Sequence, residues 1–184
     1  MVPAEPLAVS DQQPPRNLQD TKQQTALAEW KPPAPGLADP AWQGLWLTVD
    51  RLPWKALALI PAGEGAPADF TLSLAITLSH MGMAHVGGPI MVADGTQVPF
   101  NQLNAFLADV RICTEGGERV IVALSAASVN PTTPAIAKST DGVILCVLLE
   151  RMRSADAKQT IKLVGSNKFV GSIIIHPDQT TNAR

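Results

Sequence analysis

The chain has 184 residues, of which 46% are apolar and 16% charged, enough for one globular domain with a sizeable core. Its formal net charge is -2, and the sequence contains no basic face or stripe that would attract phosphates, so we expect no nucleic-acid partner. The chain does not begin with a basic and apolar leader, and no apolar run approaches the roughly 20 residues that cross a bilayer. We therefore expect a cytoplasmic protein without direct membrane insertion.

Residues 1–40 predict a disordered tail, because they combine eight of the 16 prolines with many glutamines and few large apolar side chains. Within this tail, "LQDTKQQTALAEW" either stays solvated or forms a short helix on a partner. We expect a single domain over 41–178 and a short C-terminal tail over 179–184.

The stretch "AWQGLWLTVDRL" places Trp42, Leu45, Trp46 and Val49 at the spacing of an amphipathic helix. The pattern predicts a helix that packs against the following domain. As an alternative, Trp42 and Trp46 are exposed aromatic anchors for a protein partner.

From residue 52 onward, short apolar runs alternate with amphipathic segments. The runs predict strands covered on both faces: "KALALIP", "PIMVAD", "RVIVALS", "DGVILCVLL" and "FVGSIII". The segments predict helices over 67–81, 100–110, 131–139 and 155–165. This alternation predicts a three-layer, doubly wound, mostly parallel α/β sheet. Pro67 suits the first position of the first of these helices, and Gly82 suits its C-terminal cap.

In such a sheet, ligands bind beyond the carboxyl ends of the strands. Five groups of residues should gather at that edge: Gly63 to Pro67, Asp94, Ser125 to Asn130, Glu150 and His176.

The layout around "IPAGEGAPADF" is the strand, glycine-containing loop and helix of a phosphate-binding loop. Gly63, Glu64 and Gly65 are followed by Ala66 and Pro67, so the expected lysine, the magnesium-binding hydroxyl and one backbone donor are missing. Each charge-assisted hydrogen bond contributes roughly 1.5 to 3 kcal/mol, and the losses predict triphosphate binding weaker by about a thousandfold or more. We expect ATP and magnesium binding to be lost or weak. The remaining turn is either purely structural or holds a weak anion.

The other strand ends also lack the residues of a nucleotide hydrolase. Ala123, Leu124 and Ser125 stand where such an enzyme places an aspartate in the magnesium shell. Asp94 is either a residual ligand or the first residue of an Asp-Gly turn. We expect no catalytic residue and no metal site.

In their order, these motifs resemble the cytoplasmic ATPase domain of bacterial tyrosine autokinases and of their relatives in capsule and exopolysaccharide synthesis. That family lies within the larger group of chromosome- and septum-positioning ATPases. "LIPAGEGAPADFTLSLAITLSHMG" looks like the family's phosphate loop and helix, "PIMVADG" like its second acidic motif with Asp94, and "KFVGSIIIHP" like its last strand. By this resemblance, His176 stands where relatives often carry an asparagine that contacts the base. The chain contains no tyrosine, so it lacks the tyrosine-rich tail that such kinases phosphorylate.

The resemblance implies a pathway, and the missing residues predict a protein without catalysis. We expect a scaffold or regulator in exopolysaccharide synthesis or export, which a protein partner recruits to the inner membrane. The expected partner is a membrane-bound chain-length or export component, an active ATPase homologue, or a second copy of the chain, contacted through Trp42, Trp46, Arg151 and Arg153. Two alternatives stay open: an unconventional ATPase completed by a partner subunit or by Lys55, and a small-anion sensor.

Overall fold

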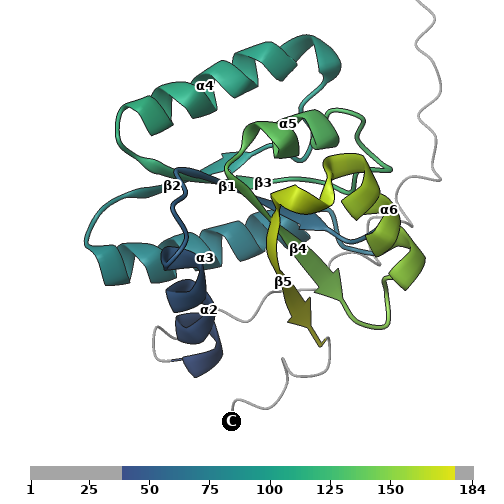
Figure 1. Cartoon of the computed structure of the whole chain (residues 1–184), viewed down its shortest axis with the longest axis horizontal. Coiled ribbons are helices and arrows are strands. Elements are labelled where there is room, and N and C mark those ends of the chain that lie inside the picture. Colours follow the sequence, from purple (N-terminus) through teal and green to yellow (C-terminus); the bar gives the residue numbers. More distant parts are fainter. Residues whose placement is uncertain (1–38, 177–184) are drawn as a thin grey trace, which may run out of the picture. The chain divides into compact units, whose positions relative to one another are not determined.

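The computed structural model describes residues 39–176. It contains a five-stranded sheet in which all strands are parallel, in the order β2-β3-β1-β4-β5 (Figure 1). The strands are β1 (Ala56–Pro61), β2 (Ile90–Asp94), β3 (Arg119–Ala123), β4 (Gly142–Leu148) and β5 (Phe169–Ile175). The predicted α/β fold is confirmed. The predicted tails over 1–40 and 179–184 lie almost wholly outside the described residues.

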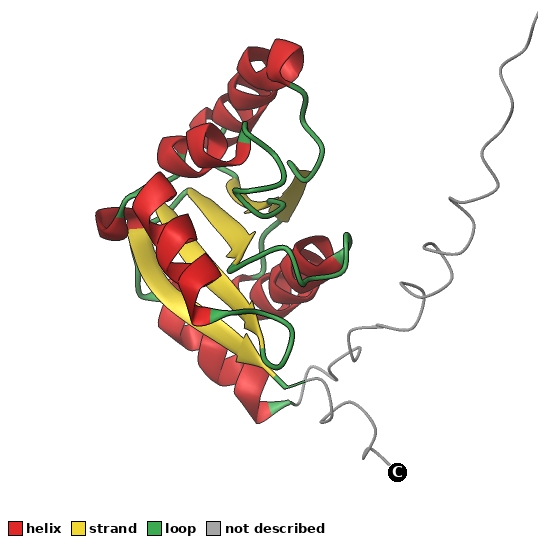
Figure 2. Cartoon of the chain, turned by 90° about the vertical axis from the view of Figure 1, so that its right-hand side faces the viewer, coloured by secondary structure: helices red, strands yellow, loops and turns green. Residues whose placement is uncertain are grey.

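Helices cover both faces of the sheet (Figure 2). They are α2 (Pro40–Asp50), α3 (Phe70–Val86), α4 (Leu103–Glu115), α5 (Thr133–Ser139) and α6 (Ser154–Val164), with 3-10 turns η1 (Phe100–Gln102) and η2 (Ser166–Lys168). α3 packs on β1, β2 and β3, and α2 packs on α3. On the other face, side chains of α4, α5 and α6 join those of the strands in one apolar cluster. The helices thus form two outer layers around the sheet.

The strands differ in how completely they are buried. Every residue of β1 is buried, and β3 and β4 are almost fully buried, as their continuous apolar sequences predict. In β2 and β5 most residues are exposed or half-buried, so the expectation that all five runs are covered on both faces is wrong for these two. The reason is the strand order, which puts β2 and β5 at the sheet's edges.

α2 packs against the domain, as predicted, through Trp46 and Val49. Trp46 is only 1% exposed, so the hypothesis that it is an exposed partner contact is wrong. A Cβ on Gly82 would overlap the Trp46 ring and Ile90, which explains why a residue without a side chain occupies that position of α3. The predicted cap at Gly82 is therefore also wrong: α3 continues to Val86 and ends at Gly87, whose φ of 69° suits glycine.

At the amino edge of the sheet, polar side chains are paired. The Asp141 carboxylate accepts hydrogen bonds from the backbone N-H groups of Lys55 and Ala56 at 2.8 and 2.9 Å, just where β1 begins. Arg119 forms an ion pair with Asp50 and lies 5.0 Å over the Trp54 ring. These contacts tie the first residues of β1, β3 and β4 to their neighbours.

Across residues 39–176, none of the helices is both long and apolar enough to cross a membrane.

Candidate functional site

A cavity of about 460 Å³ lies at the carboxyl ends of three strands. Its lining comes from the loops that follow β1, β3 and β4 and from one side of α6: Ala62, Gly63, Glu64, Gly65, Ser128, Arg151, Arg153, Asp156, Gln159, Thr160 and Leu163. In the sheet, β3 and β2 lie on one side of β1, and β4 and β5 lie on its other side. The strand order therefore reverses at β1. Ligands of doubly wound folds bind at this kind of point.

The glycine loop is packed closely against the β4-α6 connection. A Cβ on Gly65 would overlap the carbonyl oxygen of Arg151, and one on Gly63 would lie 2.8 Å from the Cβ of Asp156. Close approach of the Arg151 backbone explains Gly65, and close approach of the Asp156 side chain explains Gly63. Glu150 turns the chain just before Arg151 with a φ of 68°, a conformation uncommon for a residue other than glycine.

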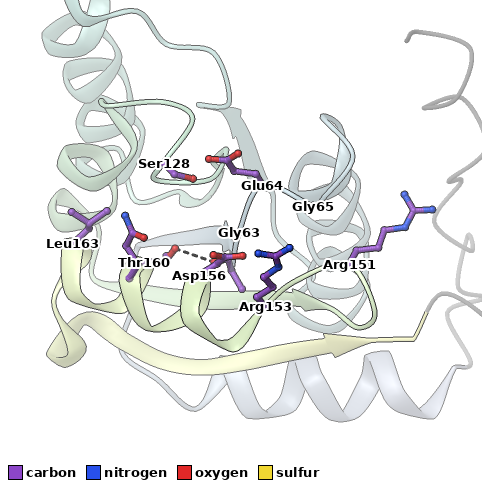
Figure 3. A pocket seen from close by; sticks show the side chains of 11 residues that line it. Gly63, Glu64, Gly65, Ser128, Arg151, Arg153, Asp156, Thr160 and Leu163 are labelled. Carbon is purple, nitrogen blue, oxygen red and sulfur yellow. Dashed lines mark hydrogen bonds between the residues drawn. The ribbon is translucent and has the colours of Figure 1, made fainter. Parts of the chain in front are cut away.

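Two residues of α6 complete this packing, and the sequence analysis did not predict them. The Thr160 hydroxyl, which is buried, donates a hydrogen bond of 3.1 Å to the carbonyl oxygen of Ala62. The Asp156 carboxylate has an oxygen 3.0 Å from the Cβ position of Gly63 (Figure 3). Because the hydrogen bond joins residues 98 positions apart, no local sequence pattern signals it.

α3 begins three residues later than predicted. Pro67 precedes a turn in which the Phe70 N-H donates to the Pro67 carbonyl oxygen at 3.1 Å, and the helix begins at Phe70. The prediction that Pro67 is the first helical residue is therefore wrong. Asp69 is the N-terminal cap residue, yet its side chain makes no capping hydrogen bond. The helix N-terminus is thus separated from Gly65 by four residues and carries an acidic side chain.

The end of β3 is apolar. Ala123 and Leu124 are fully buried, and the Leu124 carbonyl oxygen accepts a hydrogen bond of 2.7 Å from the buried Thr71 hydroxyl. The Ser125 hydroxyl lies 3.4 Å from that of Thr133. This strand end therefore packs against α3 and offers no carboxylate to the cavity.

Asp94 forms a turn at the end of β2. Its carboxylate accepts hydrogen bonds from the backbone N-H and the hydroxyl of Thr96, at 2.9 and 2.6 Å. This geometry favours the turn over a residual ligand role. β3 separates β2 from β1, and Asp94 does not line the cavity.

The loop after β2 is fastened to the loop after β3. The Asn130 side-chain amide donates to the carbonyl oxygens of Thr96 and Val98, at 3.3 and 3.4 Å, and the Thr132 hydroxyl donates to Val98 at 2.9 Å. Beside these bonds, Phe100 and Val129 are 81% and 61% exposed. Two large apolar side chains are therefore presented to solvent from hydrogen-bonded loops.

The cavity carries charges of both signs. Among the described residues, the side chains of Arg151, Arg153, Glu64 and Asp156 form no ion pair or hydrogen bond. Arg153 lies beside Asp156, whereas the Arg151 side chain points away from the other labelled residues (Figure 3). The two guanidinium groups therefore do not converge on one point.

The remaining predicted residues lie elsewhere. His176 is exposed directly after β5, and half-buried Trp42 lies on α2; neither lines the cavity. Lys55 stands at the amino end of β1, and its ammonium group donates to the Thr114 carbonyl oxygen at 3.4 Å. The glycine loop follows the opposite end of that strand, so Lys55 is on the wrong side of the sheet to replace the missing lysine.

Neither cysteine has the surroundings of a catalytic or metal-binding thiol. Cys146 is buried in β4, and this burial raises the pKa of its thiol far above the ordinary value. Cys113 is half-buried in α4 and free. Within residues 39–176, His, Cys, Asp and Glu side chains nowhere gather in threes as they would around a metal ion.

No known protein family and no curated protein matches the sequence. Two solved structures are similar in fold. One is the crystal structure of the chimeric protein CapA2B2, with a TM-score of 0.62 and 12% identity over 88% of this chain and 99% of that chain. The other is the BceF tyrosine kinase domain, with a TM-score of 0.51 and 13% identity over 84% of this chain and 86% of that chain. The chain therefore shares the α/β fold of a tyrosine kinase domain, in agreement with the resemblance found in its sequence.

Proposed function

We propose that the chain is a non-catalytic, protein-binding domain built on the fold of a nucleotide-binding ATPase. The observation that carries this proposal is the closed packing of the glycine loop. The Arg151 carbonyl oxygen and the Asp156 side chain press against Gly65 and Gly63, where a phosphate loop needs room for an anion.

Three further features oppose triphosphate binding. Ala66 and Pro67 supply no cation and no hydroxyl. α3 starts only at Phe70, so the first turn of the helix does not adjoin the loop as it does where a phosphate binds. The Glu64 and Asp156 carboxylates border the cavity and would repel a compact polyanion.

The competing ATPase hypothesis needs a lysine from outside this chain's loop. The position of Lys55 favours a partner subunit as its source. ATP hydrolysis that appears only when the partner is added would support that alternative over our proposal.

The proposed pathway is bacterial exopolysaccharide synthesis or export. It rests on the sequence resemblance, with support from the fold shared with a tyrosine kinase domain. The proposed partners are a membrane-bound chain-length or export component and an active ATPase homologue. In this proposal the protein acts in the cytoplasm and reaches the inner membrane through its partner.

Titration calorimetry with ATP and magnesium tests the proposal. We expect no binding at nucleotide concentrations up to about 1 mM, an affinity limit of about -4 kcal/mol. Micromolar affinity, together with turnover that Asp94→Ala abolishes, would refute a non-catalytic role.

The small-anion sensor needs a separate measurement. A ligand that binds only the folded state raises the unfolding temperature, so inorganic phosphate should raise it if the sensor hypothesis holds. Our proposal expects no change. A rise that disappears in Arg153→Ala and persists in Arg51→Ala would favour the sensor, since Arg51 is exposed at the end of α2, away from the cavity.

A further inference from the structure

We infer that the carboxyl edge between Phe100 and Arg151 binds an extended segment of a partner protein, with a large apolar residue at one end and acidic residues at the other. This inference rests on the proposed protein-binding function and names its surface and the chemistry of its partner. We call this surface the edge surface; it comprises Phe100, Val129, Ser128, Arg153 and Arg151.

The apolar end is defined by exposure and by fixed backbone. Phe100 and Val129 are among the most exposed large apolar side chains of the described residues. Their loops are joined by the hydrogen bonds of Asn130 and Thr132, so little loop entropy is lost when a partner covers them. Exposed aromatic side chains on such loops are frequent anchors of protein interfaces.

The acidic end is defined by charge. Arg151 and Arg153 are exposed, and within residues 39–176 neither guanidinium has an ionic or hydrogen-bonding partner. Guanidinium groups bind carboxylates through paired, charge-assisted hydrogen bonds. Two free arginines therefore favour a partner with at least two acidic side chains.

The side chains of Arg151 and Arg153 point in different directions, which favours an extended ligand over a compact one. Arg153 lies beside Asp156, while Arg151 points outward, so the two guanidinium groups do not point at a common position (Figure 3). Glu64 and Asp156 add negative charge to the cavity that the two arginines line. An extended chain can place neutral or basic residues there and its carboxylates at the arginines, whereas a triphosphate cannot separate its charges in this way.

The cavity links the two ends. Ser128 lines the cavity together with Arg151 and Arg153, and Val129 of the apolar end follows Ser128 directly in the loop after β3. An extended chain advances about 3.3 Å per residue, and a segment of about ten residues reaches across the four adjacent strand ends from β2 to β4.

Fluorescence anisotropy on the full chain tests the inference with a labelled peptide of about ten residues, phenylalanine near one end and four glutamates near the other. We expect saturable binding that weakens when NaCl rises from about 50 to about 300 mM. A peptide with lysine in place of each glutamate should not bind, and one with serine in place of phenylalanine should bind at least about fivefold more weakly.

Protein variants test whether binding depends on the edge surface itself or only on the overall charge and hydrophobicity of the protein. Arg151→Glu and Arg153→Glu should each weaken binding by about tenfold or more, whereas Arg51→Glu, the same charge change just after α2, should alter it less than about twofold. Phe100→Ser should weaken binding, and Ile112→Ser should not, since Ile112 is 64% exposed on α4 outside the edge surface. Circular dichroism of each variant checks that it folds.

The inference is overturned if the acidic peptide does not bind, if the lysine peptide binds as well, or if Arg51→Glu weakens binding as much as Arg153→Glu. Competition by inorganic phosphate at equal ionic strength would also overturn it, because a compact anion would then be the ligand. Micromolar ATP binding would instead refute the proposed function, so the two failures are distinguishable.

Discussion

The amino and carboxyl ends of the strands form two edges of the sheet, and these two edges differ in what their charged side chains do. At the amino edge, Asp141, Arg119 and Lys168 each bind a neighbouring chain segment. At the carboxyl edge, the side chains of Arg151, Arg153 and Glu64 contact no described polar group. Charged groups that are paired across the fold stabilise it, while unpaired surface charges contribute little to stability. The comparison teaches that charge pairing at the amino edge helps to hold the fold together, whereas Arg151, Arg153 and Glu64 at the carboxyl edge are left unpaired among the described residues.

The glycine loop also lies at the carboxyl edge, but its packing is part of the fold. Gly65→Ala should lower the free energy of unfolding by about 3 kcal/mol, since the new Cβ meets the Arg151 backbone and not a flexible side chain. Gly44→Ala is the control: no atom lies within 4 Å of its Cβ position, and it should stabilise α2 by about 0.5 to 1 kcal/mol. Urea denaturation measures both. If Gly65→Ala leaves the free energy of unfolding unchanged, the loop is free to move away from Arg151 and can make room for a phosphate.

The carboxylates of the two edges give the sharpest contrast. Asp141→Ala should destabilise the fold by about 2 kcal/mol, because two backbone donors at the start of β1 lose their acceptor. Glu64→Ala should change stability by less than about 0.5 kcal/mol, because its exposed side chain has no ion-pair or hydrogen-bond partner within residues 39–176. If Asp141→Ala and Glu64→Ala lower the free energy of unfolding equally in thermal or urea denaturation, the contrast between the two edges is refuted.

Burial of Cys146 makes stability depend on pH. Its thiol stays protonated in the folded chain, whereas in the unfolded chain it loses its proton near the ordinary pKa of 9.0. Above that pH the folded state binds more protons than the unfolded state, so the free energy of unfolding should fall by about 1.4 kcal/mol per pH unit.

Urea denaturation between about pH 8 and pH 10 measures this slope. Cys146→Val should reduce it and Cys113→Val should retain it. The absence of tyrosine removes one other group that titrates in the same range. An identical slope in all three proteins would contradict the assigned cause.

The arginines of the two edges give the smallest expected contrast. Arg119→Met should cost about 1 kcal/mol, because the partly buried ion pair with Asp50 and the stacking on Trp54 are both lost. Arg153→Met should leave stability within about 0.5 kcal/mol while it weakens peptide binding, by less than the charge reversal Arg153→Glu. If Arg153→Met destabilises the fold as strongly, its guanidinium is structural and not available to a ligand.

Much of the site was predictable from sequence because it depends on which residues are missing. Ala66 and Pro67 exclude a lysine and a hydroxyl wherever the loop lies. The turn at Asp94 was also open to prediction, since an Asp-Gly pair forms its hydrogen bonds within a few residues. Asp156 and Thr160 were not predictable, because their contacts with the loop join segments about 90 residues apart.

The sequence by itself determined the alternation of strands and helices, since hydrophobic periodicity is a local property of each segment. It also determined that the glycine loop lacks the groups that hold a triphosphate. Only the tertiary structure decided that Trp46 is buried beneath Gly82, that Lys55 stands at the far edge from the loop, and that β2 and β5 are the exposed edges. These features depend on which distant segments pack together, because that packing decides which side chains are buried and which charges are paired.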